Sequence, residues 1–250
     1  EWIRERTGIG ERHVSVGETV VTLASEAARK ALEQAGKKAE EIDLILVATC
    51  SPEQYLPCCA CQVQADIGAV NALAFDVNAA CSGFLFALNT ADAYLRTGLA
   101  ENALIIGSEV LSKLVDWTDR SSCILFGDGA GAVVVEQCRA ESRAVEYGNA
   151  LPVVEEKRIP AAGILGRSLH SDGTGGGVLQ CGARKLTTPY ARTSAAKTDQ
   201  NQPTNDREHY IQMDGQEVYR FATRRVPQCI EEALSDAGLA VPDIDMFVLH

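Results

Sequence analysis

Long apolar runs are missing from this sequence of 250 residues. The segment LILVA at 44–48 is typical of its apolar stretches, and none approaches the ~18 residues that a membrane-spanning helix needs. The opening residues, EWIRERTGIGERH, are charged and contain no apolar signal region. We therefore expect a cytoplasmic protein that has no membrane partner.

Positive charge is also in short supply, since 23 Lys and Arg residues face 34 Asp and Glu residues and the formal net charge is −11. This excess of negative charge argues against nucleic acid as the main partner. A local basic patch is still compatible with it, because YRFATRR places Arg220 and Arg224 one helical turn apart, with Arg225 adjacent. From this stretch alone, a solvated helix face is an equally good interpretation.

A metal-ligand pattern is missing. The sequence has four histidines, none of them near the CxxC at residues 58–61, and no second CxxC completes a set of four ligands. The nine cysteines lie mostly among apolar or small residues, so we expect reduced thiols and no metal. We interpret the cysteines at 58, 59 and 61 as small residues of a helix whose first turn contains Pro57. Its predicted face consists of Ala60, Val63 and Ile67.

Signatures of a nucleotide-binding module are weak. FGDGAGA at 126–132 and SDGTGGG at 171–177 are Gly-rich, and such loops can hold phosphates through backbone N–H groups. Neither fits GxxxxGKS/T or GxGxxG. Nucleotide binding therefore stays an alternative function, and the glycines of the first stretch are better explained by close backbone packing before a buried strand.

An internal repeat is the clearest sign of domain organisation. ALEQAGKKAEEIDLILVA (31–48) and ALSDAGLAVPDIDMFVLH (233–250) align without a gap. Each copy predicts the end of an amphipathic helix, a glycine C-cap, a short acidic connection and a buried strand. The preceding helices carry the apolar faces Val20, Ala24, Ala27 and Ala31 in the first copy, and Val226, Ile230 and Leu234 in the second.

Strands and helices alternate after the first copy, which predicts an α/β fold with largely parallel sheets and helices on both faces. The predicted strands include AFDVNAA, ALIIGSEV and GAVVVEQ. The second copy has reached only its first strand at His250, so we expect most of the second half to lie outside this sequence. We divide the chain into an N-terminal half (1–137), an insertion of loops and short strands (138–209) and the start of a C-terminal half (210–250).

The stretch FDVNAACSGFLFAL at 75–88 places Cys81 between a predicted strand and a predicted helix. The first residues of a helix have free backbone N–H groups and lie at the positive end of its dipole, which favours a thiolate and can hold an oxyanion. On these grounds a nucleophile and a small buried hydrophobe are equally good interpretations of Cys81.

Five separated motifs together resemble the β-ketoacyl-acyl-carrier-protein synthase III family, the condensing enzymes that start fatty-acid synthesis. They are EWIRERTGI, DVNAACSGFLFAL, VLSKLVDWTDRSSCILFGDGAGAVVV, MDGQEVYRFA and DIDMFVLH. The resemblance implies a thiolase-like fold of two duplicated βαβ-rich halves in αβαβα layers, with the second half truncated here.

The resemblance also implies the reaction. An acyl group passes from acyl-CoA to Cys81, and a decarboxylative Claisen condensation with malonyl-acyl-carrier protein then gives 3-ketoacyl-acyl-carrier protein and CO2. A homodimer is implied, with no cofactor beyond the substrate acyl-CoA. The alternative is a related acyltransferase of secondary metabolism that uses a non-malonyl acceptor.

The resemblance assigns roles to individual residues. Cys81 matches the acylated nucleophile and His250 the histidine that polarises the malonyl substrate, whereas the asparagine partner of that histidine and the oxyanion glycine lie beyond this chain. Leu56 matches a residue that reaches across the dimer into the partner's acyl pocket. Trp2 and Arg120 match the pair around the CoA adenine, and Arg6 matches a residue near the CoA phosphates. Gly215 and Tyr219 match positions that line the pantetheine tunnel. Arg220 matches a position in the carrier-protein docking site, where Arg224 and Arg225 would assist.

Overall fold

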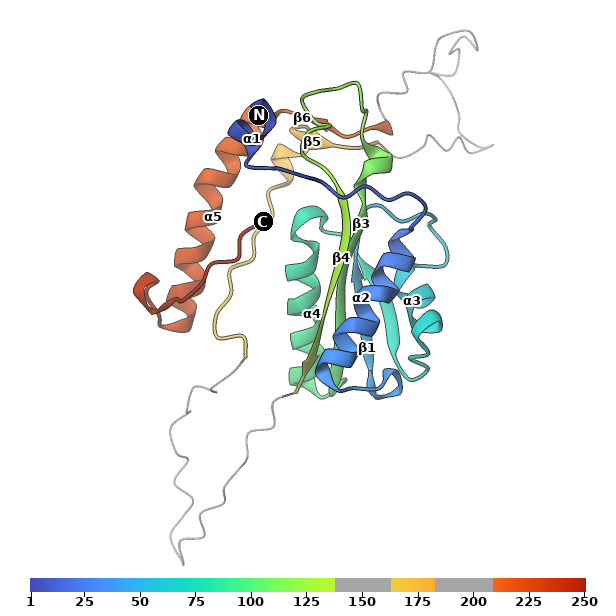
Figure 1. Ribbon diagram of the computed structural model, residues 1–250. Coiled ribbons are helices and arrows are strands. Elements are labelled where there is room, and N and C mark those ends of the chain that lie inside the picture. Colours follow the sequence, from blue (N-terminus) through green and yellow to red (C-terminus); the bar gives the residue numbers. More distant parts are fainter. Residues whose placement is uncertain (138–162, 183–208) are drawn as a thin grey trace, which may run out of the picture.

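The computed structural model describes residues 1–137, 163–182 and 209–250. Its centre is a four-stranded sheet with the order β2-β1-β3-β4 (Figure 1). The strands are β1 (Leu44–Ala48), β2 (Leu73–Val77), β3 (Asn102–Val110) and β4 (Asp128–Glu136). β1 is parallel to both of its neighbours, and β4 is antiparallel to β3. The predicted α/β architecture with mostly parallel strands is confirmed.

Helices cover both faces of this sheet (Figure 1). Side chains alternate along β1, so that Ile45 and Val47 pack with α2 and α3 while Leu44 and Leu46 pack with α4. All five residues of β1 are buried, as expected of a central strand between two helical layers. These helices span Val20–Ala35 (α2), Cys59–Ile67 (α3) and Gly83–Thr97 (α4).

The buried face of α2 differs slightly from the predicted one. Val20 and Ala24 are fully buried as expected, but Ala28 and Leu32 complete the face, and Ala27 and Ala31 are only half-buried. Positions three and four residues apart lie on the same side of a helix, so a sequence pattern cannot decide between these two sets. The larger Leu32 side chain fills the core at the end of the helix.

We predicted Pro57 in the first turn of α3, but the helix starts two residues later, at Cys59. Pro57 precedes the helix and follows a cis peptide bond, and Cys58 is the N-cap residue. The helix is capped instead by the Asp76 carboxylate from β2, which accepts hydrogen bonds from the backbone N–H groups of Cys59 (2.9 Å) and Ala60 (2.7 Å). This cap comes from a residue 16 or 17 positions away, which no local sequence pattern reveals.

The predicted buried face of α3 is confirmed. Ala60 and Val63 are fully buried, and Ile67 packs against the same cluster. Cys59 also belongs to this core, whereas Cys61 is exposed and its sulfur lies 3.6 Å from the carbonyl oxygen of Ala74. The cysteines of this stretch therefore do not share one packing role.

Both copies of the repeat fold in the same way as far as the connection after the helix. Gly36 and Gly238 end their helices in left-handed conformations, with φ of 63° and 67°. In each copy a carboxylate caps the following turn: Glu41 accepts from the Lys38 N–H (2.7 Å), and Asp243 accepts from the Ala240 N–H (2.8 Å). The turns are Ala39–Glu41 and Val241–Asp243, and the second helix is α5 (Gly215–Ala237).

The last part of the second copy does not form the strand that we predicted. Residues 244–250 have no regular structure, and Met246 and Val248 are exposed. β1 is a strand because β2 and β3 pair with it, whereas no described strand lies beside 244–250. The predicted face of α5 is not buried for the same reason: Ile230 and Leu234 are half-buried, and Val226 is 40% exposed whereas its counterpart Ala24 is 0% exposed.

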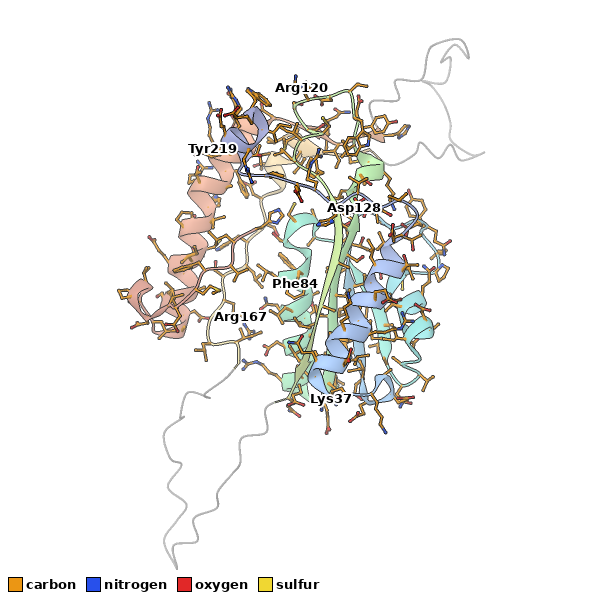
Figure 2. All side chains as sticks on the ribbon, in the orientation of Figure 1. Lys37, Phe84, Arg120, Asp128, Arg167 and Tyr219 are labelled. Carbon is orange, nitrogen blue, oxygen red and sulfur yellow. The ribbon has the colours of Figure 1, made fainter. Side chains whose placement is uncertain are left out.

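The remaining described elements pack at one end of the sheet or along α5. They are α1 (Trp2–Thr7), η2 (Ala80–Ser82), η3 (Leu111–Leu114), η4 (Gly173–Gly175), β5 (Leu179–Gln180) and β6 (Gln212–Met213). Arg167 pairs with Asp92 of α4, and its N–H donates to Asp236 of α5 (3.0 Å), so residue 167 bridges the two helices (Figure 2). Within the described ranges, no helix combines the length and the apolar character of a membrane span.

The segment before α2 is tied to the sheet by Asp128, the first residue of β4 (Figure 2). Its carboxylate accepts hydrogen bonds from the Ser15 N–H (2.7 Å), the Ser112 N–H (2.8 Å) and the Ser112 hydroxyl (2.6 Å), and its own N–H donates to the His13 carbonyl (2.9 Å). Burial alone would raise the pKa of Asp128, but these hydrogen bonds outweigh burial and hold the pKa below its usual value.

Replacing Asp128 by asparagine should lower the free energy of unfolding by about 1–3 kcal/mol at neutral pH, because hydrogen bonds to an ionised carboxylate are lost. The pKa is lower in the folded state, so this stabilisation is complete above the unfolded pKa of about 3.9 and disappears as the pH falls through the folded-state pKa. Urea unfolding should show the difference between wild type and Asp128→Asn narrowing towards about pH 2. The exposed Glu33→Gln is the control, and a difference independent of pH would contradict this role.

Candidate active site

Cys81 lies in the short turn η2, which joins β2 to α4. The preceding residue, Ala80, has a φ of 46°, in the left-handed region that side chains with a Cβ rarely adopt. The turn is held by hydrogen bonds from Ala80 N–H to the Asn78 side chain (3.3 Å) and from Ser82 N–H to the Ala79 carbonyl (3.1 Å). Cys81 is exposed, so the interpretation as a small buried hydrophobe is wrong.

The helix after this turn starts directly against the end of β1. Gly83, the first residue of α4, is buried, and a Cβ added there would lie 3.2 Å from the Ala48 Cβ. The Ser82 side chain makes no capping hydrogen bond, so it leaves the first N–H groups of α4 to other partners. These groups and the helix dipole stabilise negative charge that develops beside Cys81.

Glu109 of β3 fixes the turn that follows β1, next to the Cys81 turn. Its carboxylate accepts hydrogen bonds from the Cys50 N–H (2.8 Å), the Thr49 hydroxyl (3.2 Å) and the Ser51 hydroxyl. The Thr49 N–H in turn donates to the Val77 carbonyl (3.2 Å), which extends the pairing of β1 and β2 by one residue. Sequence reasoning missed Glu109 and Cys50, although the polar TCS directly after a buried strand is the signal that would have found this turn.

The structure brings Trp2, Arg6 and Arg120 together. The guanidinium carbons of Arg6 and Arg120 lie 4.9 and 5.3 Å from the centre of the Trp2 ring, and both distances are within the range of a cation–π interaction. Arg120 is labelled in Figure 2. Trp2 is 46% exposed, so part of its ring faces solvent. In this arrangement a purine does not fit between Trp2 and Arg120, because the guanidinium already occupies the ring face. The Arg120 side chain must move before an adenine can stack there.

A small hydrophobic cluster connects the elements that carry these residues. Ile3, next to Trp2, packs against a cluster that contains Val115 and Cys123 from the loop before β4 and Ile211 from the chain before α5. The Ile211 N–H also donates to the Leu114 carbonyl (2.8 Å). The cluster therefore places α1, the Arg120 loop and the start of α5 at the same end of the molecule.

Gly215 lines a hollow of about 720 Å³ at the first turn of α5. Asp214 caps this helix by accepting hydrogen bonds from the N–H groups of Gln216 and Glu217, both at 3.1 Å. Tyr219 lies one turn further along α5, is 69% exposed and does not line the hollow (Figure 2). The residues that line it are Gly177, Gln180, Gln212, Met213, Asp214, Gly215 and Gln216.

The arginines of α5 are accessible. Arg220 is exposed and pairs with Glu217 one turn earlier, so part of its charge is neutralised. Arg224 is also exposed, and Arg225 donates to the Gln228 side chain (3.0 Å). This stretch is therefore a solvated helix face, and its proposed role in docking is compatible with that exposure.

Leu56 and His250 are both exposed. Leu56 is 85% exposed and stands next to Tyr55, which is 71% exposed. His250 is exposed, and the structure shows no hydrogen bond between it and Cys81. Since 244–250 is not held in a sheet, the structure does not assemble the predicted pair of Cys81 and His250, and their joint role stays a prediction.

The Gly-rich stretches form no phosphate-binding loop. FGDGAGA enters β4, where only Gly127 is closely packed, with an added Cβ 3.0 Å from the His13 carbonyl oxygen. Gly129 and Gly131 are exposed and have open space around them, so our packing explanation was right for Gly127 alone. In SDGTGGG the Thr174 N–H donates to the Asp172 side chain (3.0 Å), which places a carboxylate where a phosphate would bind. Groups of three or more potential metal ligands do not occur among the described residues.

Comparison with known proteins finds relatives along the whole chain. A family profile described as "3-Oxoacyl-[acyl-carrier-protein (ACP)] synthase III" matches residues 75–173, and one described as "Thiolase, N-terminal domain" matches residues 4–123. The "Beta-ketoacyl-[acyl-carrier-protein] synthase III" of Clostridium acetobutylicum is 42% identical over 250 residues, which are 100% of this chain and 67% of that protein. The enzyme of the same name from Synechococcus sp. is 45% identical over 251 residues, covering 100% of this chain and 66% of that protein.

Solved structures give the same result. The 3-oxoacyl-[acyl-carrier-protein] synthase III from Aquifex aeolicus superposes with a TM-score of 0.77 at 37% identity, over 97% of this chain and 65% of that chain. A priming β-ketosynthase of a polyketide biosynthetic pathway superposes with a TM-score of 0.74 at 32% identity, over 97% of this chain and 63% of that chain. This chain thus spans about two thirds of the length of its relatives. The predicted fold is confirmed, and the chain belongs to the β-ketoacyl-acyl-carrier-protein synthase III family of thiolase-like condensing enzymes.

Proposed function

We propose that this chain carries the acyl-accepting half of an initiating condensing enzyme of type II fatty-acid synthesis. The observation that supports this most directly is the exposed Cys81 on a strained turn at the start of α4. Strain of this kind is maintained by surrounding structure and is common at catalytic positions. Here the Gly83 contact with Ala48 and the hydrogen bonds of the turn maintain it.

In the first step the Cys81 sulfur attacks the thioester carbonyl of acyl-CoA. A tetrahedral oxyanion forms, the bond to the CoA sulfur breaks, and CoA leaves as a thiol while the acyl group remains on Cys81. Backbone N–H groups at the start of α4 are suitable donors to the oxyanion, because they are fixed before the reaction begins. The acyl-CoA is consumed as a substrate, so this step needs no cofactor.

In the second step malonyl-acyl-carrier protein loses CO2, and the resulting carbanion attacks the Cys81 thioester to give 3-ketoacyl-acyl-carrier protein. We propose His250 as a hydrogen-bond donor to the malonyl thioester carbonyl, a role that suits an imidazole near neutral pH. Arg220 and Arg224 are exposed on α5 and support a docking site for the acidic carrier protein, since guanidinium groups attract its carboxylates.

The CoA moiety is proposed to bind around Trp2. An aromatic ring and guanidinium planes recognise a purine by stacking and cation–π attraction. Arg6 and Arg120 already lie against that ring and can turn toward the adenine and the phosphates. The hollow beside Gly215, with Tyr219 one turn beyond it, is the proposed place for the pantetheine arm.

A homodimer is proposed from the exposed edge of the sheet. Among the described strands β2 lies at the edge of its sheet. Leu73 on it is 54% exposed, and the nearby Val70 and Leu56 are 74% and 85% exposed. An unpaired edge strand with apolar side chains is a template for pairing with a second chain. In such a dimer Leu56 is proposed to reach the partner's acyl pocket.

We also retain the cytoplasm as the proposed compartment, since the cysteines of the described residues are all free thiols.

The similarity to a priming β-ketosynthase keeps one alternative open, a related acyltransferase of secondary metabolism with a non-malonyl acceptor. Both functions share acylation of Cys81 and binding of CoA. Formation of 3-ketoacyl-acyl-carrier protein from malonyl-acyl-carrier protein, followed by mass spectrometry of the carrier, distinguishes them. A protein that acylates Cys81 but leaves the malonyl carrier unchanged would favour the alternative.

Acylation of Cys81 can be tested directly. After incubation with acetyl-CoA, intact mass and peptide mapping should find one acetyl group on Cys81, and Cys81→Ala should abolish it because the nucleophile is removed. Cys61→Ala removes another exposed thiol and should leave the adduct in place. A folded chain that gains no acyl group from any of several acyl-CoAs would refute the proposed function.

The nucleotide site is tested with the two tryptophans. Trp2→Ala should raise the Kd for CoA by about 5- to 100-fold, the range expected when one base loses an aromatic stacking partner. Trp117 is a matched control, because it is 49% exposed and also lies under an arginine, with the Arg12 guanidinium carbon 5.5 Å from its ring centre. Calorimetric titration of Trp117→Ala with CoA should change Kd by less than about twofold. Equal effects of both variants would contradict adenine stacking on Trp2.

The dimer is tested at β2. Leu73→Glu places a charge on the proposed interface and should raise the dimer dissociation constant at least about tenfold, equivalent to about 1.4 kcal/mol. Sedimentation velocity over a dilution series gives this constant. Leu99→Glu, on a leucine that is 73% exposed after α4, should leave the constant unchanged. Monomeric wild-type protein at all concentrations would exclude the dimer.

A further inference from the structure

A second thiol lies beside the Cys81 turn. Cys50 follows β1 and Cys81 follows β2, so both come from the carboxyl ends of neighbouring parallel strands. Parallel strands are about 4.8 Å apart, and the hydrogen bond from Thr49 N–H to the Val77 carbonyl (3.2 Å) holds them together up to the residue before Cys50.

The turn that carries Cys81 folds back over the end of β1. An added Cβ on Gly83, two residues after Cys81, would lie 3.2 Å from the Cβ of Ala48, two residues before Cys50. The two cysteines therefore flank the place where the start of α4 approaches the end of β1. The Cys50 backbone is itself fixed, since its N–H donates to the Glu109 carboxylate (2.8 Å).

The environments of the two thiols differ, and this difference decides which of the two reacts first with an oxidant. Burial, followed by the charge of Glu109 and a hydrogen bond to it, raises the pKa of Cys50 to about 12, and the thiols of Cys81 and Cys181 are close enough to contribute. Cys50 is therefore a protonated, half-buried thiol that reacts slowly when it meets an oxidant directly. Cys81 is exposed at a helix start and is the thiol that an oxidant meets first.

We propose that Cys50 is the resolving cysteine for Cys81, so that a peroxide converts the pair into a reversible disulfide. The Cys81 sulfur attacks hydrogen peroxide, the O–O bond breaks, one oxygen stays on sulfur as a sulfenic acid, and the other leaves as water. The Cys50 sulfur then attacks the Cys81 sulfur, the S–O bond breaks, and the departing hydroxide takes the Cys50 proton and leaves as a second water.

The proposal gives Cys50 a role that the acyl-transfer chemistry does not require. Without a resolving thiol, a sulfenic acid advances to sulfinic and sulfonic acids, which are not restored by thiols. Closing the disulfide stops this sequence, and a dithiol reductant then returns both cysteines to the free state. Formation of the disulfide needs the free Cys81 thiol, the Cys50 thiol and a peroxide, so an acyl group on Cys81 blocks it, but the reaction does not require that Cys81 can be acylated by acyl-CoA.

Other thiols are possible competitors. Cys181 is exposed, its sulfur lies 3.3 Å from the His209 carbonyl oxygen, and it is within electrostatic reach of Cys50. Cys58, the N-cap residue of α3, and Cys61 interact with each other, and the hydrogen bond between their side chains is the main cause that raises the pKa of Cys61. We favour Cys50 over Cys181 because two hydrogen bonds fix the Cys50 turn: the Thr49 N–H donates to the Val77 carbonyl of β2, and the Cys50 N–H donates to the Glu109 carboxylate of β3.

The test is oxidation of the full chain with a small excess of hydrogen peroxide, followed by alkylation of the remaining thiols and peptide mapping without reduction. We expect a crosslinked peptide pair joining Cys50 to Cys81, with loss of two hydrogens from the intact mass, and full return of alkylatable Cys81 after dithiothreitol. In Cys50→Ser we expect sulfinic and sulfonic acid at Cys81 and at least about tenfold less recovery of the thiol.

Cys181→Ser and Cys61→Ser are the matched controls, and both should still form the Cys50–Cys81 crosslink. A crosslink from Cys81 to Cys181, or recovery of Cys81 in Cys50→Ser equal to wild type, would overturn the proposal. Circular dichroism of Cys50→Ser shows whether the variant is folded, and Cys50→Ala provides a second variant if it is not. Because the readout is the mass of the peptides, failure here and failure of acylation by acetyl-CoA are separate results.

Discussion

The contact between Gly83 and Ala48 determines the geometry around Cys81. With no side chain at Gly83, α4 begins directly on the end of β1, and an added Cβ would approach that of Ala48 to 3.2 Å. The chain must then complete the passage from β2 to α4 in a very short turn, which forces Ala80 into the left-handed region and turns Cys81 outward. A larger residue at 83 would have to move the helix away from the sheet, because a Cβ at 83 and the Cβ of Ala48 are both attached directly to the backbone and cannot rotate out of the way.

Polar groups at the ends of the strands complete this arrangement. Asp76 caps α3, Glu109 fixes the turn after β1, and Asp128 holds the N-terminal segment against the sheet. Each is a carboxylate that satisfies backbone N–H groups left free where a regular element starts or ends. The apolar side chains of β1 build the core, and these three carboxylates decide where the connecting segments lie.

Sequence patterns predicted the elements better than their connections. β1 is the buried strand that was predicted at the end of the first repeat, and the glycine caps at 36 and 238 are where the repeat placed them, because both follow from local chemistry. The cap at Asp76 and the Glu109 turn were missed, since their partners are distant in the sequence. For the candidate site, the sequence pattern placed Cys81 at the start of a helix, and only the family resemblance grouped Trp2 with Arg120. Neither predicted that the guanidinium already stacks on the indole.

The helices of the two repeat copies end in similar sequences but differ in how firmly they are held to the rest of the protein. In the first copy the helix face is sealed by a sheet, so opening α2 requires disruption of the main core. In the second copy α5 has no buried residue and is held to its neighbours by polar contacts such as that of Arg167 with Asp236. Local unfolding of α5 therefore costs much less free energy than global unfolding, and this helix behaves as a separate cooperative unit that opens while the sheet around Cys81 remains intact.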